Sequence, residues 1–435
     1  MKLFRGMASP RAGVTRRGVQ VMSVAAAAVL ALSACSTAGG GNSSGKSAGG
    51  ELTFSNWQFL EDGKGPILWD AVKGYTGPDG NVSLTKIEIP FANYADKLST
   101  ELGARGGPDV MVLQDSQFAS LADAGVLEPL DDIAKELGDS LNGTNKAGFF
   151  QDKQFGFNWE RPTYNTVIYN KDLFTELGLK VPTTFDEFLA TAKTIKEQRG
   201  IAGWAGRHQT AEIDGWTLEM ANWIYGFGGE LSDGKELTID APANVKAVEA
   251  FLETFKSGVA PIGDDASTFR AKFGQGQVGM LFENSGVATT LTSNPKNVIN
   301  GQNLGAAPLP MANAGSNSQL ILAVNAASKN KEAAKDFVRW VLGEKGQTAL
   351  RAGLGASAMA TDVEPDPEFL KANPWATQFL EAAKTSRSTL VEGFETESKV
   401  IWREFLTAVE DLRVNGGDVA AKLAGVQKAL KAELS

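Results

Sequence analysis

The side chains that could do chemistry in this sequence are carboxylates and tryptophans. Asp115 and Glu283 each follow a predicted strand, Glu160 follows a tryptophan, and the chain has nine tryptophans in all. Two carboxylates about 5–10 Å apart could serve as the acid and base of glycoside hydrolysis. The same carboxylates could instead accept hydrogen bonds from the hydroxyls of a bound ligand, with aromatic rings as apolar platforms. Both kinds of site stay open at this point.

Other catalytic chemistries find little support. The chain has one histidine, His208, and one cysteine, Cys35. A structural zinc site needs about four ligands such as Cys and His, so we expect no metal site and no cofactor. A Ser-His-Asp triad would have to use His208, and residues 51–435 contain no Gly-x-Ser-x-Gly elbow. We therefore expect His208 to be structural or exposed to solvent.

Cys35 closes an N-terminal segment with the order of a secretory signal. Residues 1–20 carry five Lys or Arg and no acid, and the weakly apolar run 21–32 follows. This run is too short to span a bilayer, which needs about 20 residues. Cys35 follows Leu-Ser-Ala, which resembles a bacterial lipobox, so we predict a signal peptide over 1–34 and a lipid on Cys35. A soluble secreted protein with an incidental cysteine is the alternative, and the export route stays open.

The next residues and the overall charge limit the partners. Residues 36–50 read STAGGGNSSGKSAGG, which together with Cys35 predicts a flexible tether over 35–50. Removal of 1–34 takes away five positive charges, so the formal net charge falls from −9 to −14. An acidic chain of this kind repels nucleic acid, and we expect no such partner. A chain of 435 residues is also too long for one compact core, which predicts two domains.

Strands and helices alternate from residue 51 onward. Strands are expected over 52–55, 82–89 and 110–113, with helices between them, which predicts an α/β fold with a mostly parallel sheet. Ligands of such sheets lie beyond the carboxyl ends of the strands. That rule selects Trp57 and Gln58 after the first strand and Asp115 and Ser116 after the third.

A second series of elements begins with a strand over 166–169. Thr184 to Glu187 predicts a capping box that opens a helix reaching about residue 196. The apolar run 278–282 predicts a buried strand, and Glu283 and Asn284 follow it. The last 60 residues are predicted to be mostly helical.

From residue 51 onward the chain resembles the family 1 extracellular solute-binding proteins, the carbohydrate-binding subunits of bacterial ABC importers. The resemblance rests on the shared order of several segments rather than on one decisive motif. These segments are GPDV at 107–110 with AGVLEPL at 124–130, IYNKDLF at 168–174 with VP at 181–182 and FDEF at 185–188, FGQG at 273–276 with GM at 279–280, and ASKNKEAA at 327–334.

The resemblance implies a type II periplasmic-binding-protein fold, with two α/β lobes and the ligand in the cleft between them. The first lobe would comprise 51–160 and 316–355, and the second 161–315 and 356–435. The chain would cross between the lobes near 159–164, 312–318 and 353–357, and these crossings would act as a hinge. The implied protein is a monomer without enzymatic activity. It would capture a sugar, remain held to the membrane only by its lipid, and deliver the sugar to a membrane permease.

Sugar sites combine aromatic platforms with planar polar side chains, and this pattern selects the candidate cleft residues. Trp402 resembles a late cleft aromatic of the family, whereas Trp57 and Trp216 have core packing as an alternative. Glu160 has a salt bridge to Arg161 as its alternative. The full set of candidates is Trp57, Gln58, Asp115, Ser116, Trp159, Glu160, Trp216, Glu283, Asn284 and Trp402.

Two further points stay open. Ser285 and Gly286 stand where the maltodextrin-binding members have an aromatic residue, so the identity, length and linkage of the sugar are not determined. The competing functions are a lipid-anchored glycosidase, which would use Asp115, Glu160 or Glu283, and a surface adhesin or sensor. Trp69, Trp223, Trp340 and Trp375 are expected to be packing residues.

Overall fold

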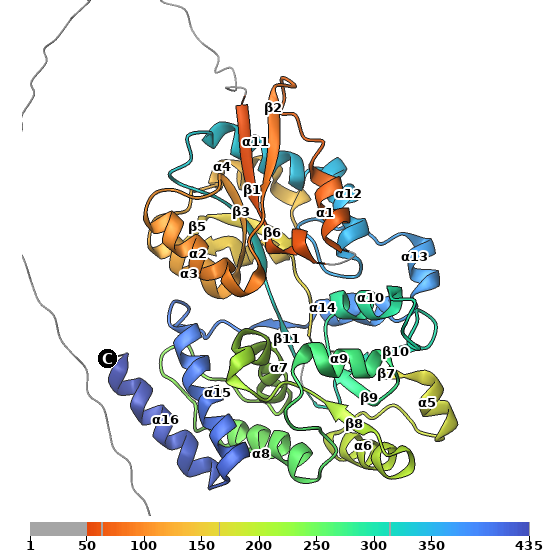
Figure 1. The fold of residues 1–435 in the computed structure, drawn as a ribbon. Helices are drawn as coiled ribbons and strands as arrows, with labels where there is room; N and C mark the ends of the chain where they lie inside the picture. Colours follow the sequence, from red (N-terminus) through yellow and green to blue (C-terminus); the bar gives the residue numbers. More distant parts are fainter. Residues whose placement is uncertain (1–49, 62–63, 165, 313–314, 435) are drawn as a thin grey trace, which may run out of the picture. The chain divides into compact units, whose positions relative to one another are not determined.

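The computed structural model describes residues 50–61, 64–164, 166–312 and 315–434. The predicted signal peptide, Cys35 and the tether up to residue 49 lie outside these residues. Within the described ranges, the strands form two main sheets and two small pairs (Figure 1). None of the helices there is both long and apolar enough to cross a membrane.

The larger sheet has five strands in the order β2-β1-β3-β12-β6. Its strands are β1 (Gly50–Ser55), β2 (Val82–Ile87), β3 (Val110–Gln114), β6 (Gly156–Glu160) and β12 (Leu320–Val324). Strands β1, β2 and β3 are parallel, and β12 is antiparallel to both its neighbours. The apolar runs in β3 and β12 are buried, as expected for central strands covered on both faces.

The parallel register brings the residues after β1 and β3 to one edge of this sheet. Ser55 pairs with Ile87 of β2 and Met111 of β3, so these strands end at the same side. After β1, Asn56 Oδ1 accepts a hydrogen bond from the backbone N–H of Gln58 at 3.0 Å and opens the short 3-10 helix η1 (Trp57–Leu60). After β3, Asp115 directly begins helix α3 (Asp115–Asp123).

Helices cover the five-stranded sheet on both faces. Phe54 of β1 makes edge contacts with Phe59, Trp159 and Phe337, which join three different elements in one core. The helices packed on this sheet or following its strands are α1 (Lys64–Val72), α2 (Phe91–Gly103), α3 (Asp115–Asp123), α4 (Asp131–Leu137), α11 (Lys331–Leu342) and α12 (Glu344–Leu354).

The smaller sheet has four strands in the order β10-β7-β9-β8. They are β7 (Thr166–Asn170), β8 (Ala202–Ala205), β9 (Val278–Phe282) and β10 (Leu304–Pro308). Trp204 and Trp223 are fully buried here, with ring centroids 5.7 Å apart. The helices between these strands are α5 (Lys171–Glu176), α6 (Phe185–Arg199), α7 (Ile213–Gly226), α8 (Pro242–Lys256), α9 (Ala266–Gly274) and α10 (Ser285–Ser293).

The predicted capping box opens α6, with one change. Thr184 Oγ1 accepts a hydrogen bond from the backbone N–H of Glu187 at 3.3 Å. The Glu187 carboxylate accepts from the backbone N–H of Thr183 at 2.8 Å, one residue earlier than in the standard box. The helix ends at Gly200, whose φ of 68° is left-handed and favours glycine.

The C-terminal part is helical, as predicted, and packs around the four-stranded sheet (Figure 1). Trp375 is buried there against Phe379, and Trp340 stacks on Phe337, so both are packing residues. The remaining elements are α13 (Pro367–Ala372), α14 (Ala376–Ala383), α15 (Ser398–Asn415), α16 (Val419–Glu433), β4 (Phe149–Phe150), β5 (Lys153–Gln154), β11 (Ser316–Asn317), β13 (Arg387–Ser388), η2 (Gly138–Ser140), η3 (Gly143–Gly148) and η4 (Thr210–Glu212).

The segments that connect the two main sheets are hydrogen-bonded to one another. The backbone N–H of Arg161, just after β6, donates to Ala358 O at 2.8 Å. The backbone N–H of Ser318, just before β12, donates to Pro162 O at 3.1 Å. Met359 and Ala360 lie beyond the expected lobe boundary at 355 and yet pack in the core of the five-stranded sheet. We call residues 161–164, 315–319 and 355–358 the crossing segments.

Candidate ligand-binding cleft

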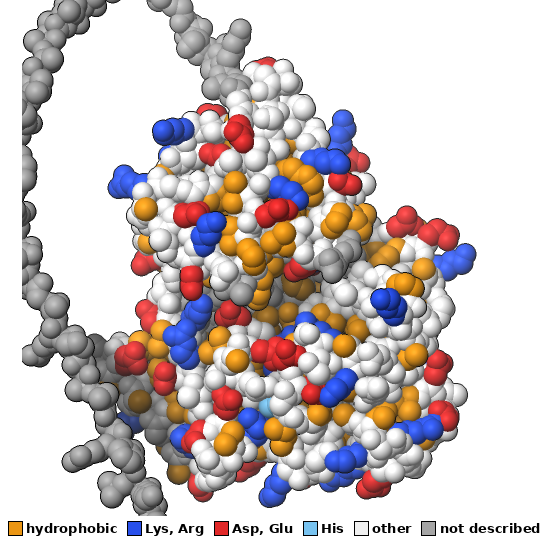
Figure 2. Space-filling view, viewed as in Figure 1, with side chains coloured by type: hydrophobic (Ala, Val, Ile, Leu, Met, Phe, Trp, Pro, Cys, Tyr) orange, Lys and Arg blue, Asp and Glu red, His pale blue; other side chains and the backbone are white. Residues whose placement is uncertain are grey.

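A pocket of about 480 Å³, part of it open to solvent, lies between the end of β3 in the five-stranded sheet and the helices α7 and α15 that pack around the four-stranded sheet. Gln114, Asp115 and Ser116 come from the end of β3 and the start of α3, and Ser318 comes from a crossing segment. Figure 2 shows the surface hollowed between the regions of the two sheets. The other lining residues are Ile213, Asp214, Thr217, Leu218, Thr389, Leu390, Ser398, Lys399 and Trp402.

Asp115 is held in place by the first turn of its own helix. Its Oδ1 accepts from the backbone N–H of Ser116 at 2.9 Å, and its backbone N–H donates to Gln319 O at 3.0 Å. Its Oδ2 accepts from Ser388 Oγ at 3.3 Å, which links the end of β3 to β13. Burial raises the pKa of Asp115 to about 6, and these hydrogen bonds only partly offset the desolvation.

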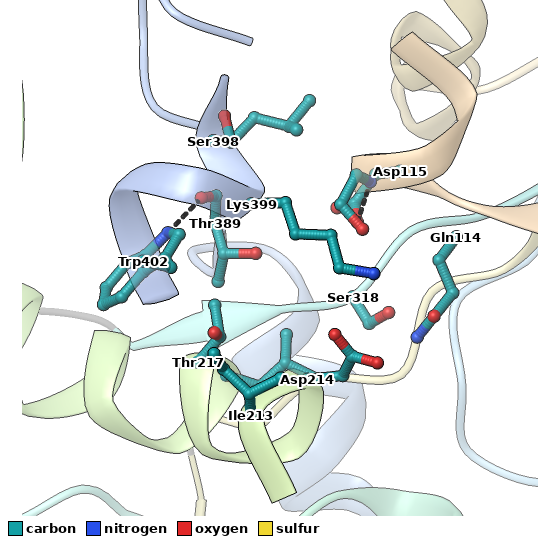
Figure 3. A pocket seen from close by; sticks show the side chains of 13 residues that line it. Gln114, Asp115, Ile213, Asp214, Thr217, Ser318, Thr389, Ser398, Lys399 and Trp402 are labelled. Atoms are coloured by element: carbon teal, nitrogen blue, oxygen red, sulfur yellow. Dashed lines mark hydrogen bonds between the residues drawn. The ribbon is translucent and has the colours of Figure 1, made fainter. Parts of the chain in front are cut away.

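Asp214 and Lys399 bring two more charges to the same pocket. Asp214 lies in the first turn of α7 and Lys399 in the first turn of α15. In Figure 3 their side chains point into the space that Asp115, Gln114 and Ser318 also face. Neither side chain makes a hydrogen bond or ion pair with another residue in the described part of the chain. The carboxylate of Asp214 and the ammonium group of Lys399 are therefore available to hydrogen-bond a ligand, and the Asp115 carboxylate beside them has further lone pairs that can accept.

Trp402 forms one wall of the pocket from the second turn of α15. Its indole Nε1 donates to Thr389 O at 2.8 Å, which fixes the ring against the segment after β13 (Figure 3). Phe405 packs edge-on against the ring at 5.8 Å. With its N–H satisfied by the protein, the indole offers a ligand its apolar surface rather than a donor.

A second polar group of residues lies at the end of β6. The Glu160 carboxylate accepts from Lys64 Nζ at 2.8 Å, from Gln58 Nε2 at 2.5 Å and from Ser357 Oγ at 2.8 Å. Ser357 Oγ in turn lies 2.9 Å from Ser285 Oγ at the start of α10. Glu160 therefore forms its salt bridge with Lys64 rather than with Arg161. Through Ser357, its hydrogen bonds extend to Ser285 of α10, the helix that follows β9 of the four-stranded sheet.

A buried cluster of charges follows β9. Arg270 Nε lies 2.6 Å from Glu283 Oε1, Arg207 Nη2 lies 3.8 Å from the same oxygen, and Arg207 Nη1 lies 3.2 Å from Glu219 Oε2. Burial opposes ionisation of Glu283, but the two arginines outweigh it and lower the pKa of Glu283. Burial dominates at Glu219 and raises its pKa to about 8, although Arg207 acts in the opposite direction.

His208 is structural, as predicted. It is buried, and its Nε2 accepts a hydrogen bond from the backbone N–H of Gly263 at 2.9 Å. Its Nδ1 lies 2.9 Å from Gly206 O and so carries the proton. The part of the chain that the structure describes contains no group of three or more His, Cys, Asp or Glu side chains that could hold a metal ion.

Comparison with known proteins shows the family to which the chain belongs. Residues 61–348 match the family of bacterial extracellular solute-binding proteins. The chain belongs to this family. The resemblance inferred from the sequence is thereby confirmed, and the protein is a solute-binding protein rather than an enzyme.

Two curated relatives span most of this solute-binding protein. The diacetylchitobiose binding protein DasA of Streptomyces coelicolor is 29% identical over 394 residues, which cover 83% of this chain and 84% of that protein. The galactooligosaccharide-binding protein of Bacillus subtilis is 25% identical over 339 residues, which cover 75% of this chain and 76% of that protein.

Solved structures confirm the type II periplasmic-binding-protein fold. The GacH receptor of Streptomyces glaucescens, determined unliganded and with acarbose, is similar with a TM-score of 0.77 at 21% identity, covering 88% of this chain and 98% of that one. Maltose-bound MalE3 of T. maritima is similar with a TM-score of 0.75 at 22% identity, covering 88% of this chain and 99% of that one.

Only some of the candidate residues chosen from the sequence line the pocket of this solute-binding protein. Asp115, Ser116 and Trp402 do so. Gln58 and Glu160 lie in the polar group at the end of β6, where the Trp159 indole N–H donates to Gln58 Oε1 at 2.9 Å. Trp159 was expected to face the cleft, but its ring is buried against Phe54 in the core.

Two more tryptophans differ from expectation. Trp216 is fully buried against Phe251 of α8, because α7 is buried on nearly all sides. Trp57 packs against Tyr94 and Phe91, with ring centroids 4.9 Å and 5.6 Å apart, and does not line the pocket, so the packing alternative describes it.

Glu283 and Asn284, which follow β9, use their polar groups in contacts within the protein. Glu283 is paired with its arginines, and Asn284 caps α10 by accepting from the backbone N–H of Val287 at 3.1 Å.

Sequence reasoning missed Asp214 and Lys399. Lys399 lies one helical turn before Trp402, and this spacing was the signal that could have found it.

Proposed function

We propose that this solute-binding protein captures an oligosaccharide in the pocket at Asp115 and Trp402 and delivers it to the permease of an ABC importer. The observation that carries the proposal is the pocket itself. Side chains from β3, α7 and α15 converge there, and Asp115, Asp214 and Lys399 can pair with hydroxyls beside the apolar surface of Trp402. The relatives named for diacetylchitobiose and galactooligosaccharide support a sugar as the ligand.

We further propose that the two sheets act as lobes that close on the ligand. The first lobe would hold 51–160 and 316–355 together with Met359 and Ala360, which pack in its core. The second would hold 161–315 and the rest of 356–435, and the crossing segments would form the hinge. A ligand that touches Asp115 on one lobe and Lys399 on the other favours the closed state by its differential affinity. Small-angle scattering should show a smaller radius of gyration with bound sugar, whereas an unchanged radius at saturation would contradict closure.

The location of the protein belongs to the same proposal. The signal peptide over 1–34 would be removed, and a lipid on Cys35 would hold the monomer at the outer face of the cytoplasmic membrane. The segment 36–50, rich in Gly and Ser, would let the binding domain reach its permease. No metal or other cofactor takes part in this account.

Calorimetric titration of the chain from residue 36 tests the function. The panel comprises N-acetylglucosamine oligomers including diacetylchitobiose, galactooligosaccharides, maltooligosaccharides and, as acidic probes, oligogalacturonates. We expect saturable binding of at least one neutral series and no shortening of the sugar after prolonged incubation. Failure of every series to bind would refute the proposal, and release of shorter sugars would restore the glycosidase alternative.

A further inference from the structure

A second pocket adjoins the first behind the indole of Trp402. It measures about 540 Å³, part of it open to solvent, and lies between the end of α7 and the segment around β13. Trp402 and Leu390 line both pockets. The two spaces therefore have the Trp402 and Leu390 side chains as common walls.

Ser388 joins the two pockets by hydrogen bonds. Its hydroxyl donates to Asp115 Oδ2 of the first pocket at 3.3 Å. Its carbonyl oxygen accepts from Tyr225 Oη, which lines the second pocket, at 2.9 Å. A ligand that reaches past Trp402 therefore meets groups that are already connected to the first pocket.

The second pocket has a buried wall and a charged rim. Tyr225, Leu231 and Val391 are buried, whereas the Arg387 and Glu230 side chains are 41% and 49% exposed. The Arg387 guanidinium lies 4.0 Å from the centre of the Tyr225 ring, and its Nη1 donates to Glu230 Oε1 at 2.6 Å. This bond uses one of five guanidinium N–H donors, so the others can meet ligand hydroxyls.

The charges of the two pockets also limit the ligand. The second pocket carries Glu230 and Glu392 against Arg387, and the first carries two carboxylates against one lysine. Each therefore has one more acidic than basic side chain. Desolvating a carboxylate-bearing sugar beside such a surplus is unfavourable, whereas a neutral sugar meets no repulsion.

We propose that the second pocket is a further subsite, which takes an additional ring of an uncharged oligosaccharide bound in the first pocket. This inference rests on the proposed function and extends it from a sugar site to a site for a neutral chain that passes Trp402. Arg387 and Glu230 hydrogen-bond the additional ring, and the buried wall contacts its C–H face.

The test measures how affinity depends on ligand length. Each series of the panel is titrated from one to five sugar units into the wild-type chain, Arg387→Ala, Glu392→Trp and Arg403→Ala. Arg403 is an exposed arginine on α15 that lines neither pocket, so its variant is the matched control. Glu392→Trp narrows the mouth of the second pocket without removing Arg387. Thermal melts check that all variants are folded.

In the wild type and Arg403→Ala, we expect affinity to rise about tenfold once the chain is long enough to pass Trp402. Arg387→Ala and Glu392→Trp should remove most of this rise and leave the shortest bound sugar unaffected. Equal losses for short and long sugars would overturn the subsite, as would no length dependence in the wild type. Tighter binding of oligogalacturonates would overturn the neutral class, and no binding of any series would overturn the proposed function as well.

Discussion

The substitution Asp115→Asn should make the protein more stable and bind sugar more weakly. The carboxyl group is almost completely buried, and burial raises its pKa from 3.8 to about 6. One pKa unit corresponds to about 1.4 kcal/mol, so keeping this carboxylate ionised at neutral pH costs the folded state up to about 3 kcal/mol. Asparagine has nearly the same shape and carries no charge, so this cost disappears.

The raised pKa of Asp115 also makes the stability of the folded protein depend on pH. Between about pH 4 and pH 6 the folded protein holds a proton on Asp115 that the unfolded chain has released. This carboxyl group therefore lowers the free energy of unfolding as the pH rises through that window. Asp115→Asn should gain most stability above pH 6 and little near pH 4.

Urea unfolding of the wild type and Asp115→Asn at pH 4.5 and pH 7.5 measures this effect, and calorimetry with a bound sugar measures affinity. We expect a higher midpoint for the variant at pH 7.5 and a tenfold to hundredfold loss of affinity, on the order of 1.5–3 kcal/mol. Affinity of the wild type should also fall below about pH 6, and that of the variant should not. A variant less stable than the wild type at pH 7.5 would refute the reasoning.

Three further predictions concern other parts of the molecule. Lys399→Ala should weaken sugar binding about tenfold by calorimetry, whereas Lys428→Ala on the exposed side of α16 should not. Glu219→Ala should destabilise the protein by about 1–3 kcal/mol in urea unfolding, because it removes the oxygen atoms that accept hydrogen bonds from the buried Arg207, and an unchanged midpoint would contradict this. Cys35→Ala should release the protein from the membrane fraction on centrifugation, and wild-type fractionation would rule out the lipid anchor.

The sequence predicts the parts of the cleft that follow from strand geometry. Asp115 could be found because residues that follow parallel strands gather at one edge of a sheet, and the pairing of Ser55 with Met111 shows that edge. Trp402 could be found because its segment resembles a family cleft position. Both side chains line the pocket.

The other half of the pocket depends on tertiary packing that local patterns do not reveal. Lys399 could have been found only through its spacing to Trp402, and Asp214 lies in the first turn of α7, which meets α15 and the end of β3 only in the folded chain. The same limit applies to the tryptophans. Trp216 and Trp159 have the residue type of sugar platforms, but burial against Phe251 and Phe54 makes them core residues.

A crystal structure with a bound sugar from the titration panel tests the central claim most directly. We predict that the sugar lies against Trp402 and hydrogen-bonds Asp115 on one side and Asp214 or Lys399 on the other. A sugar that contacts only one of the two sheets, or that lies away from Trp402, would contradict the proposed capture between them.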